Sequence, residues 1–333
     1  MWIRASTLAA AAGLTIPALT PSPAWAHTHQ PGQVYVIDDG SNDVAVIDSK
    51  TNSVVAIIPV DTSPVGIAVS PDGRRAYVTN SGSDSVSVID TKHGDIIATI
   101  AVGHMPYGIA VSPDGQRVYV SSNGSNNVSV IDAKANALLA FIPVDGDPYS
   151  IAVSPDGQRI YATNDSTNNV SVIDSRTNSV IATIPVNNNP AGIAVSPDGR
   201  RIYVTNSDSG NVSVIDTRTN AVIATITVGE TPYGVAVSSN GRRIYVANNG
   251  SNDVSVIDSR TNSVIATIPV NNNPFGVAVS PDGRHAYVTN ANSNNVSVID
   301  TKTNDLTTLT IPVRLSPFGI AAPPARHYRH HRS

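Results

Sequence analysis

The chain has 333 residues, of which 41% are hydrophobic and only 14% are charged. This composition supplies enough apolar side chains for a large core and excludes an intrinsically disordered chain. The formal net charge of −4 gives no global attraction to nucleic acid or to an anionic membrane surface. The absence of cysteine excludes disulfides, thiol nucleophiles and thioether-linked haem.

The first 26 residues have the pattern of a secretory signal peptide. Arg4 is their only charged residue, an apolar run follows over residues 5–19, and Ala24-Trp25-Ala26 is a small-x-small cleavage signal. The apolar run is too short and too interrupted by proline to span a bilayer, so no membrane span is expected after cleavage. We therefore predict a secreted protein, located outside the cell, at its surface or in a periplasm. Residues 27–33 would form a short N-terminal extension.

A repeat of 42 residues fills the mature chain. Two series of residues keep this spacing, one of tyrosines and one of aspartates from Ile-Asp pairs. Their members are Tyr35, Tyr77, Tyr119, Tyr161, Tyr203, Tyr245 and Tyr287, and Asp48, Asp90, Asp132, Asp174, Asp216, Asp258 and Asp300. Seven copies of each indicate seven structural units.

One unit reads as four short strands joined by tight turns. The expected strands span residues 108–111, 117–121, 128–131 and 137–144, and the third alternates in hydrophobicity with a period of two. Ser112-Pro113-Asp114-Gly115 is a turn, because proline presets φ and glycine accepts a positive φ. No stretch of the mature chain has helical periodicity.

Seven four-stranded meanders can bury their faces only against each other, which favours a ring. The first unit lacks its own first strand, because the chain enters at Val34, whereas the last unit ends with a surplus strand, Gly319-Ile320-Ala321. We therefore predict an all-β, seven-bladed β-propeller over residues 34–322. Pairing of the C-terminal strand with the N-terminal three strands would close it. Residues 323–333 would form a basic, histidine-rich tail.

Several units carry runs that resemble the YVTN-type β-propeller repeats. These runs are Tyr77-Val78-Thr79-Asn80, Tyr203-Val204-Thr205-Asn206 and Tyr287-Val288-Thr289-Asn290, flanked by Ser-Pro-Asp-Gly and Val-Ser-Val-Ile-Asp segments. The resemblance covers about residues 34–321 and implies a likeness to YncE-like exported proteins and archaeal surface-layer propellers. It indicates a fold, so the function has to be argued from a site.

The expected meander divides the loops between two faces. Turns from first to second and from third to fourth strands share the bottom face, where charges are nearly balanced. Second-to-third loops and blade-to-blade connections share the top face, which carries eleven acidic residues and one basic residue, Arg314. The acidic residues are Asp38, Asp39, Asp43, Asp61, Asp84, Asp145, Asp147, Asp165, Asp208, Glu230 and Asp253.

Each blade-to-blade connection also places one residue at the top mouth of the central channel, in the motif Pro-x-Gly, which reads Pro148-Tyr149-Ser150 in one unit. Val65 and Ala191 fill two of the seven x positions, and the other five are aromatic. The aromatic residues are Tyr107, Tyr149, Tyr233, Phe275 and Phe318. We predict that these five residues, with His104, Glu230 and Asp147, bind a ligand at the mouth. The alternative is that the rings plug the channel and pack between blades.

The ligand or partner expected at this face is a protein, a glycan or a small molecule that is neutral or cationic. The excess of acidic residues disfavours nucleic acid there. His104 is the only histidine expected in a top loop, three blades away from Glu230. A single histidine in a loop is ordinarily solvated.

The two ends of the mature chain carry histidines. Cleavage after residue 26 would expose His27-Thr28-His29, and a free amine with histidine at position three suits Cu(II). His27 and His29 are therefore candidate copper ligands. The alternative is that both ends are disordered. No other cofactor is expected.

No catalytic residues are predicted, because the eight histidines are scattered and form no Ser-His-Asp pattern. The first functional hypothesis is an exported binding scaffold that uses the top face. The second is a lactonase-like (6-phosphogluconolactonase-type) hydrolase with carboxylates in the channel, with or without a divalent metal. Its carboxylates would be Asp61, Asp145, Asp147 and Glu230. The third is a structural surface-layer component.

Overall fold

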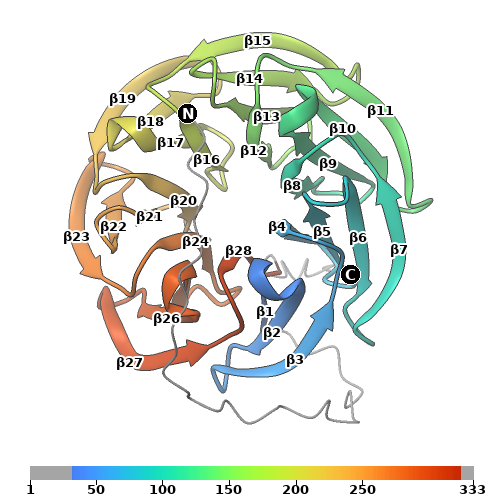
Figure 1. Ribbon diagram of the computed structural model, residues 1–333. Helices are drawn as coiled ribbons and strands as arrows, with labels where there is room; N and C mark the ends of the chain where they lie inside the picture. The colour runs from blue at the N-terminus through green and yellow to red at the C-terminus, as the bar shows by residue number, and fades with distance from the viewer. Residues whose placement is uncertain (1–31, 324–333) are drawn as a thin grey trace, which may run out of the picture.

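Seven four-stranded antiparallel sheets surround a central axis in the computed structural model, which describes residues 32–323 (Figure 1). Each sheet is one blade of a β-propeller, so the fold predicted from the repeat is confirmed. Along the chain, six blades run from the innermost strand to the outermost one, and the seventh has the order β28-β1-β2-β3.

The strands fall into four classes by their distance from the axis. The innermost strands are β4 (Pro64–Val69), β8 (Pro106–Val111), β12 (Pro148–Val153), β16 (Pro190–Val195), β20 (Pro232–Val237), β24 (Pro274–Val279) and β28 (Pro317–Ala321). The second strands are β1 (Gln33–Asp38), β5 (Arg75–Asn80), β9 (Arg117–Ser122), β13 (Arg159–Asn164), β17 (Arg201–Asn206), β21 (Arg243–Asn248) and β25 (His285–Asn290).

The third strands are β2 (Asp43–Asp48), β6 (Ser85–Asp90), β10 (Asn127–Asp132), β14 (Asn169–Asp174), β18 (Asn211–Asp216), β22 (Asp253–Asp258) and β26 (Asn295–Asp300). The outermost strands are β3 (Ser53–Pro59), β7 (Asp95–Ala101), β11 (Ala137–Pro143), β15 (Ser179–Pro185), β19 (Ala221–Thr227), β23 (Ser263–Pro269) and β27 (Asp305–Pro312). Short 3-10 helices occupy second-to-third loops: η1 (Asp39–Ser41), η2 (Asn123–Ser125), η3 (Ser207–Ser209) and η4 (Ala291–Ser293).

The core lies between blades rather than inside them. One cluster, for example, joins Val44 and Val46 of β2 to Ala76 and Val78 of β5 in the next blade. The tyrosine of the repeat is no more than 2% exposed in every blade, because it is sandwiched in these contacts. Mutual burial of blade faces is what the alternating hydrophobic pattern of the strands requires.

Polar side chains fix the turns of the repeat. In the turn after β8, Ser112 Oγ donates a hydrogen bond to Asp114 Oδ1, and Gly115 has a φ of 70°. After β10, Asp132 Oδ1 accepts the backbone N–H groups of Lys134 and Ala135 at 2.8 and 2.7 Å. These turns lie where the sequence predicts them, although β8 begins at Pro106, two residues earlier than expected.

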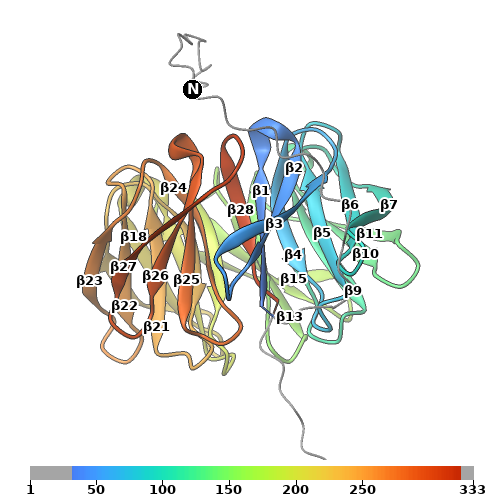
Figure 2. The ribbon, with the colours of Figure 1, turned by 90° about the horizontal axis from the view of Figure 1, so that it is seen from below.

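The ring is closed as predicted. β28 pairs antiparallel with β1, with Val36 opposite Ile320, and the two strands lie side by side in Figures 1 and 2. Beyond the strands, the N–H groups of Asp39 and Gly40 donate to the carbonyls of Ser316 and Leu315 at 3.1 and 3.0 Å. The C-terminal strand therefore completes the blade that the N-terminal strands begin.

The top and bottom faces are opposite ends of the ring, and the β1–β2 loop of the top face points upward in Figure 2. Within residues 32–323, no helix has the length and apolar character needed to cross a bilayer. The predicted signal peptide, the candidate copper ligands His27 and His29, and residues 324–333 of the predicted tail lie outside the described residues.

Candidate functional site

The top mouth is built by the residue that follows the first proline of each innermost strand. The backbone there is held by the preceding blade: the hydroxyl of Thr79 donates to the carbonyl of Tyr107 at 2.7 Å, and that of Ser121 to the carbonyl of Tyr149 at 2.9 Å. A Cβ on Gly66 would lie 2.1 Å from the Tyr107 carbonyl oxygen, so only glycine fits there. Rigid main chain therefore positions the side chains of the mouth.

The five predicted aromatic side chains form one continuous cluster. The ring centroids of the successive pairs in the series Tyr107, Tyr149, Tyr233, Phe275 and Phe318 are 5.1, 6.3, 4.8 and 4.4 Å apart. Aromatic pairs at such separations attract each other beyond the effect of their buried area. Each of the five residues is nevertheless only partly buried. The rings therefore pack together, and the residues that carry them are not fully enclosed.

A hollow lies beside the position where the aromatic series is interrupted by Ala191. Its volume is about 440 Å³, and Asn188 and Asn189 of its wall belong to the connection that leads to Ala191. The lining residues are Asp165, Ser166, Asn168, Asn188, Asn189 and Asp208. The hollow thus combines two carboxylates with amide and hydroxyl groups, without an apolar side chain in its wall.

Asp165 connects this hollow to the tyrosines. Burial, followed by the nearby charges of Asp147 and Asp208, raises the pKa of Asp165 to about 6. Burial is also the main cause of the raised pKa of Tyr107, and the charge of Asp165 is the next cause. The same charge contributes, after burial, to the raised pKa of Tyr149. No basic side chain of the described residues forms an ion pair with Asp165.

The other predicted site residues differ in how they relate to this cluster. Asp147 is partly buried, its N–H donates to Asn126 Oδ1 at 2.8 Å, and its charge acts on Asp165. Glu230 is exposed, and its N–H donates to Ser251 Oγ at 3.1 Å. Within residues 32–323, no hydrogen bond or ion pair joins Glu230 to the aromatic cluster, so the structure brings Asp147 into the site and leaves Glu230 at the rim.

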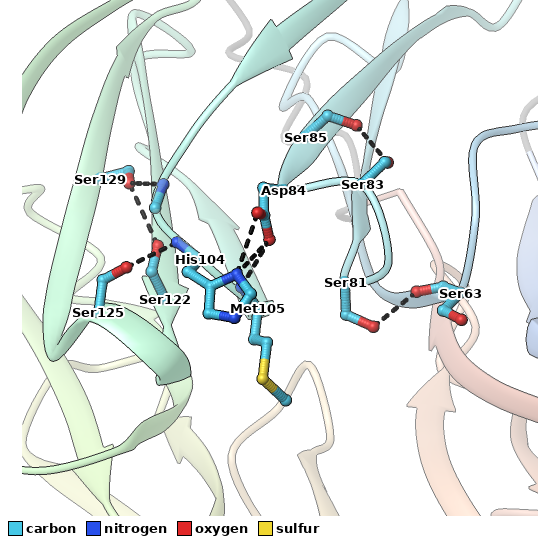
Figure 3. Close-up of polar contacts among 11 residues, drawn as sticks. Ser63, Ser81, Ser83, Asp84, Ser85, His104, Met105, Ser122, Ser125 and Ser129 are labelled. Atoms are coloured by element: carbon cyan, nitrogen blue, oxygen red, sulfur yellow. Dashed lines mark hydrogen bonds and ion pairs between the residues drawn. The ribbon is translucent and has the colours of Figure 1, made fainter.

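His104 is not isolated, in contrast to the prediction. Its Nδ1 lies 3.0 Å from both carboxylate oxygens of Asp84, which comes from the neighbouring loop (Figure 3). Asp84 Oδ1 also accepts the N–H of Met105 at 2.9 Å. The hydrogen bond from His104, and then the one from Met105, hold the pKa of Asp84 below its usual value. Other blades carry asparagine at the Asp84 position: Asn42, Asn126, Asn168, Asn252 and Asn294.

The acidic character of the top face is weaker than the sequence count implies. Asp38 and Asp43, counted there as surface charges, are 0% and 2% exposed. Arg314 lies against both of them. Its backbone N–H donates to Asp38 Oδ2, and its guanidinium Nη1 lies 2.9 Å from Asp43 Oδ2. The negative surface field therefore comes from the remaining acids, with Asp165 and Asp208 at the hollow.

The metal-dependent form of the lactonase hypothesis needs a cluster of metal-ligating side chains. Within residues 32–323, no three histidine, aspartate or glutamate side chains are grouped closely enough to hold a metal ion. Within the described residues, Asp61, Asp145, Asp147 and Glu230 therefore do not form a three-ligand metal centre.

Comparison with known families places the fold in a family context. The model of the virginiamycin B lyase family matches residues 10–297, which is most of the sequence. The chain belongs to the virginiamycin B lyase family. This is a β-propeller family, so membership agrees with the observed ring. The YVTN-type resemblance is compatible with it and stays a prediction. No protein of curated function was found to match.

Solved structures share the architecture. A hydrazine synthase chain of Kuenenia stuttgartiensis is 28% identical, with a TM-score of 0.73 over 87% of this chain and 99% of that one. A protein of unknown function from Desulfotomaculum acetoxidans has a TM-score of 0.80 at 16% identity, over 89% and 100% of the two chains. The dihydro-haem d1 dehydrogenase NirN, solved in complex with DHE, has a TM-score of 0.67 at 17% identity, over 89% and 77%. The last two likenesses concern the fold alone.

Proposed function

We propose that the protein is an exported binding protein whose top mouth takes an organic cation. The ammonium group would lie beside Asp165, and the organic part would rest on the exposed ring surfaces of Tyr107, Tyr149 and Tyr233. One observation carries the proposal: Asp165 lies partly buried in the wall of the hollow and forms no ion pair with a basic side chain within residues 32–323. The pattern of residues 1–26 supports export.

Both halves of such a ligand are matched by the chemistry of the mouth. A cation held over an aromatic face gains about 0.5–2 kcal/mol, more as the site is desolvated. A carboxylate that is partly removed from water interacts with a cation more strongly than an exposed one does. A neutral glycan would use the rings and leave the Asp165 charge unmatched, so the cation is the better fit.

Isothermal titration calorimetry with benzyltrimethylammonium tests this proposal. We expect saturable binding to the full chain and an affinity about tenfold or more lower for Asp165→Asn, since roughly 1.4 kcal/mol corresponds to a factor of ten. Asp61→Asn is the matched control, because Asp61 lies on the same face and, within residues 32–323, its side chain accepts a single hydrogen bond, from the backbone N–H of Thr62. Neutral benzyl alcohol should bind more weakly than the cation. Equal affinities of wild type and Asp165→Asn would contradict the proposal.

The same titration should depend on pH in a defined direction. A cation binds the ionised form of Asp165, whose pKa is about 6. We therefore expect the affinity for benzyltrimethylammonium to rise between pH 5 and pH 7 and to level off above that range. This rise should be absent in Asp165→Asn and kept in Asp61→Asn.

A second candidate function, lyase activity, is favoured by the pairing of His104 with Asp84 in a chain of the virginiamycin B lyase family. In an elimination, a base removes a proton from carbon, the C–H electrons form a double bond, and the leaving group departs with its electron pair. His104, oriented by Asp84, has the chemistry of such a base. If His104 acts as this base, the protein should consume virginiamycin B during incubation, and the His104→Gln variant should not. The His93→Gln variant should still consume it, because His93 pairs with Asp90 on the bottom face. Consumption that survives in His104→Gln would exclude this role for His104.

A further inference from the structure

We propose that the seam where the ring closes is a proton-dependent latch built from Asp38, Asp43 and Arg314. Asp38 ends β1 and Asp43 begins β2, and the two residues face each other across that strand pair. Arg314 belongs to the connection between β27 and β28, so it enters the closing blade together with the C-terminal strand. The three side chains therefore join the two ends of the propeller.

The seam departs from the repeat at positions that touch each other. In five of the other six blades, an asparagine ends the second strand and its amide bridges two residues of the third strand, whereas Ser122 ends the second strand of the sixth. In one such blade, Asn80 Nδ2 donates to Ser85 Oγ and Ser87 Oγ at 3.0 and 2.9 Å. The other asparagines at this position are Asn164, Asn206, Asn248 and Asn290. In the closing blade the corresponding residues are Asp38, Asp43 and Ala45, so a neutral amide network is replaced by two carboxyl groups.

Among residues 32–323, these two carboxyl groups have one basic partner, Arg314. The Arg314 N–H donates to Asp38 Oδ2 at 3.2 Å, and the Arg314 guanidinium lies 2.9 Å from Asp43 Oδ2. The Oδ1 atoms of both aspartates are buried without a hydrogen-bond partner. Two buried carboxylates facing one guanidinium would leave an uncompensated negative charge, which is costly away from water. If Asp38 is protonated, its carboxyl O–H can donate a hydrogen bond to the Asp43 carboxylate, and the excess negative charge is removed.

The direction of the pH effect follows from this arrangement. Burial, then the facing charge of Asp43, outweighs the Arg314 backbone hydrogen bond and charge, and the pKa of Asp38 rises to about 8. Burial also raises the pKa of Asp43, against the influence of Arg314, and burial raises that of the adjoining Asp39. From its ordinary value of 3.8 up to about 8, the folded state holds the Asp38 proton more tightly than the unfolded state does. The stability of the seam therefore falls as the pH rises through this range and is constant above it.

The variant Asp38→Asn tests the latch because it restores the residue of the repeat. The pair of Asn248 and Asp253, 2.6 Å apart, already shows that an asparagine donates well to a facing aspartate. An asparagine oxygen can also accept the Arg314 N–H. We expect Asp38→Asn to melt several degrees above wild type at pH 8.5 and the difference to shrink toward pH 5. Hydrogen exchange at β28 and β1, corrected for intrinsic rates, should speed up with pH in wild type and not in Asp38→Asn.

Asn248→Asp is the matched control, because it places two facing carboxyl groups in a blade that has no Arg314 equivalent in contact with them. Its melting temperature should fall more steeply with rising pH than that of wild type, while exchange at β28 should follow the wild-type pH profile, because Asp38, Asp43 and Arg314 are unchanged. Parallel pH profiles of wild type and Asp38→Asn would overturn the proton linkage. A pH effect on wild type that is spread evenly over all blades would overturn the latch.

Discussion

Deletion of residues 315–333 is expected to lower the melting temperature by about 10 °C or more. The deletion removes β28 and leaves the β1 edge without its partner strand. It also removes Phe318 and Ile320, and burial of a side chain of this size contributes about 1.5–3 kcal/mol. Unpaired backbone groups of β1 add to the loss, so we expect at least ~5 kcal/mol, with about 2 °C for each kcal/mol in a domain of this size.

Circular dichroism melting curves of three proteins measure this effect. The full chain and a chain lacking only residues 324–333 should melt together, because that shorter deletion leaves β28 in place. The chain lacking residues 315–333 should melt well below both. Coincident curves for the two deletions would show that β28 does not hold the ring closed.

Tyr161→Ala is expected to cost about 3–5 kcal/mol of the free energy of unfolding, the range for large aromatic side chains removed from a core. Tyr161 is 1% exposed and packs in a cluster with Val170 and Val172 of its own blade and Ile202 and Val204 of the next. The cavity would lie in the interface between two blades. Neighbouring side chains could fill it only if a whole sheet moved. Urea unfolding with linear extrapolation measures the loss.

Tyr149→Ala is the contrasting variant. Tyr149 is only partly buried and contacts other rings at the mouth, where each aromatic pair contributes about 0.5–1.5 kcal/mol. Its loss of unfolding free energy should be less than half that of Tyr161→Ala, while its affinity for benzyltrimethylammonium should fall. A Tyr149→Ala chain as unstable as Tyr161→Ala would mean that the mouth aromatics serve the fold rather than a ligand.

Most of the fold could be predicted from the sequence because the same pattern of strands and turns recurs in seven units. The spacing of the tyrosines set the number of blades, and the surplus strand after Pro317 set the closure. The sequence could not locate the β-bulges, such as the register shift between Val130 and Ile131 against β11. A bulge depends on how two strands twist together, and the alternation of residue types within one strand does not report it.

The candidate site was predictable in its aromatic half only. The Pro-x-Gly motif placed the five rings correctly, because all of them occupy one repeat position. Two polar pairs could not be predicted: Asp84 with His104, and Arg314 with Asp43. Each pair joins residues from different loops, and which loops touch depends on how neighbouring segments pack. The sequence does mark both places by a departure from the repeat. Asp84 and Asp38 each stand at a position where most other units carry asparagine, and the two positions differ. Nothing in the sequence distinguishes Asp165 from the other acidic residues of the top loops, so its partial burial in the wall of the hollow could not be predicted.

Ring resonances of ¹³C-labelled tyrosine, followed during titration with benzyltrimethylammonium, test most directly whether the top mouth binds a cation. The chain contains 11 tyrosines, and seven of them are the buried tyrosines of the repeat. We expect the signals of Tyr107, Tyr149 and Tyr233 to shift in a saturable way while those seven stay in place. Unmoved signals of these three tyrosines at concentrations that saturate binding would contradict the account.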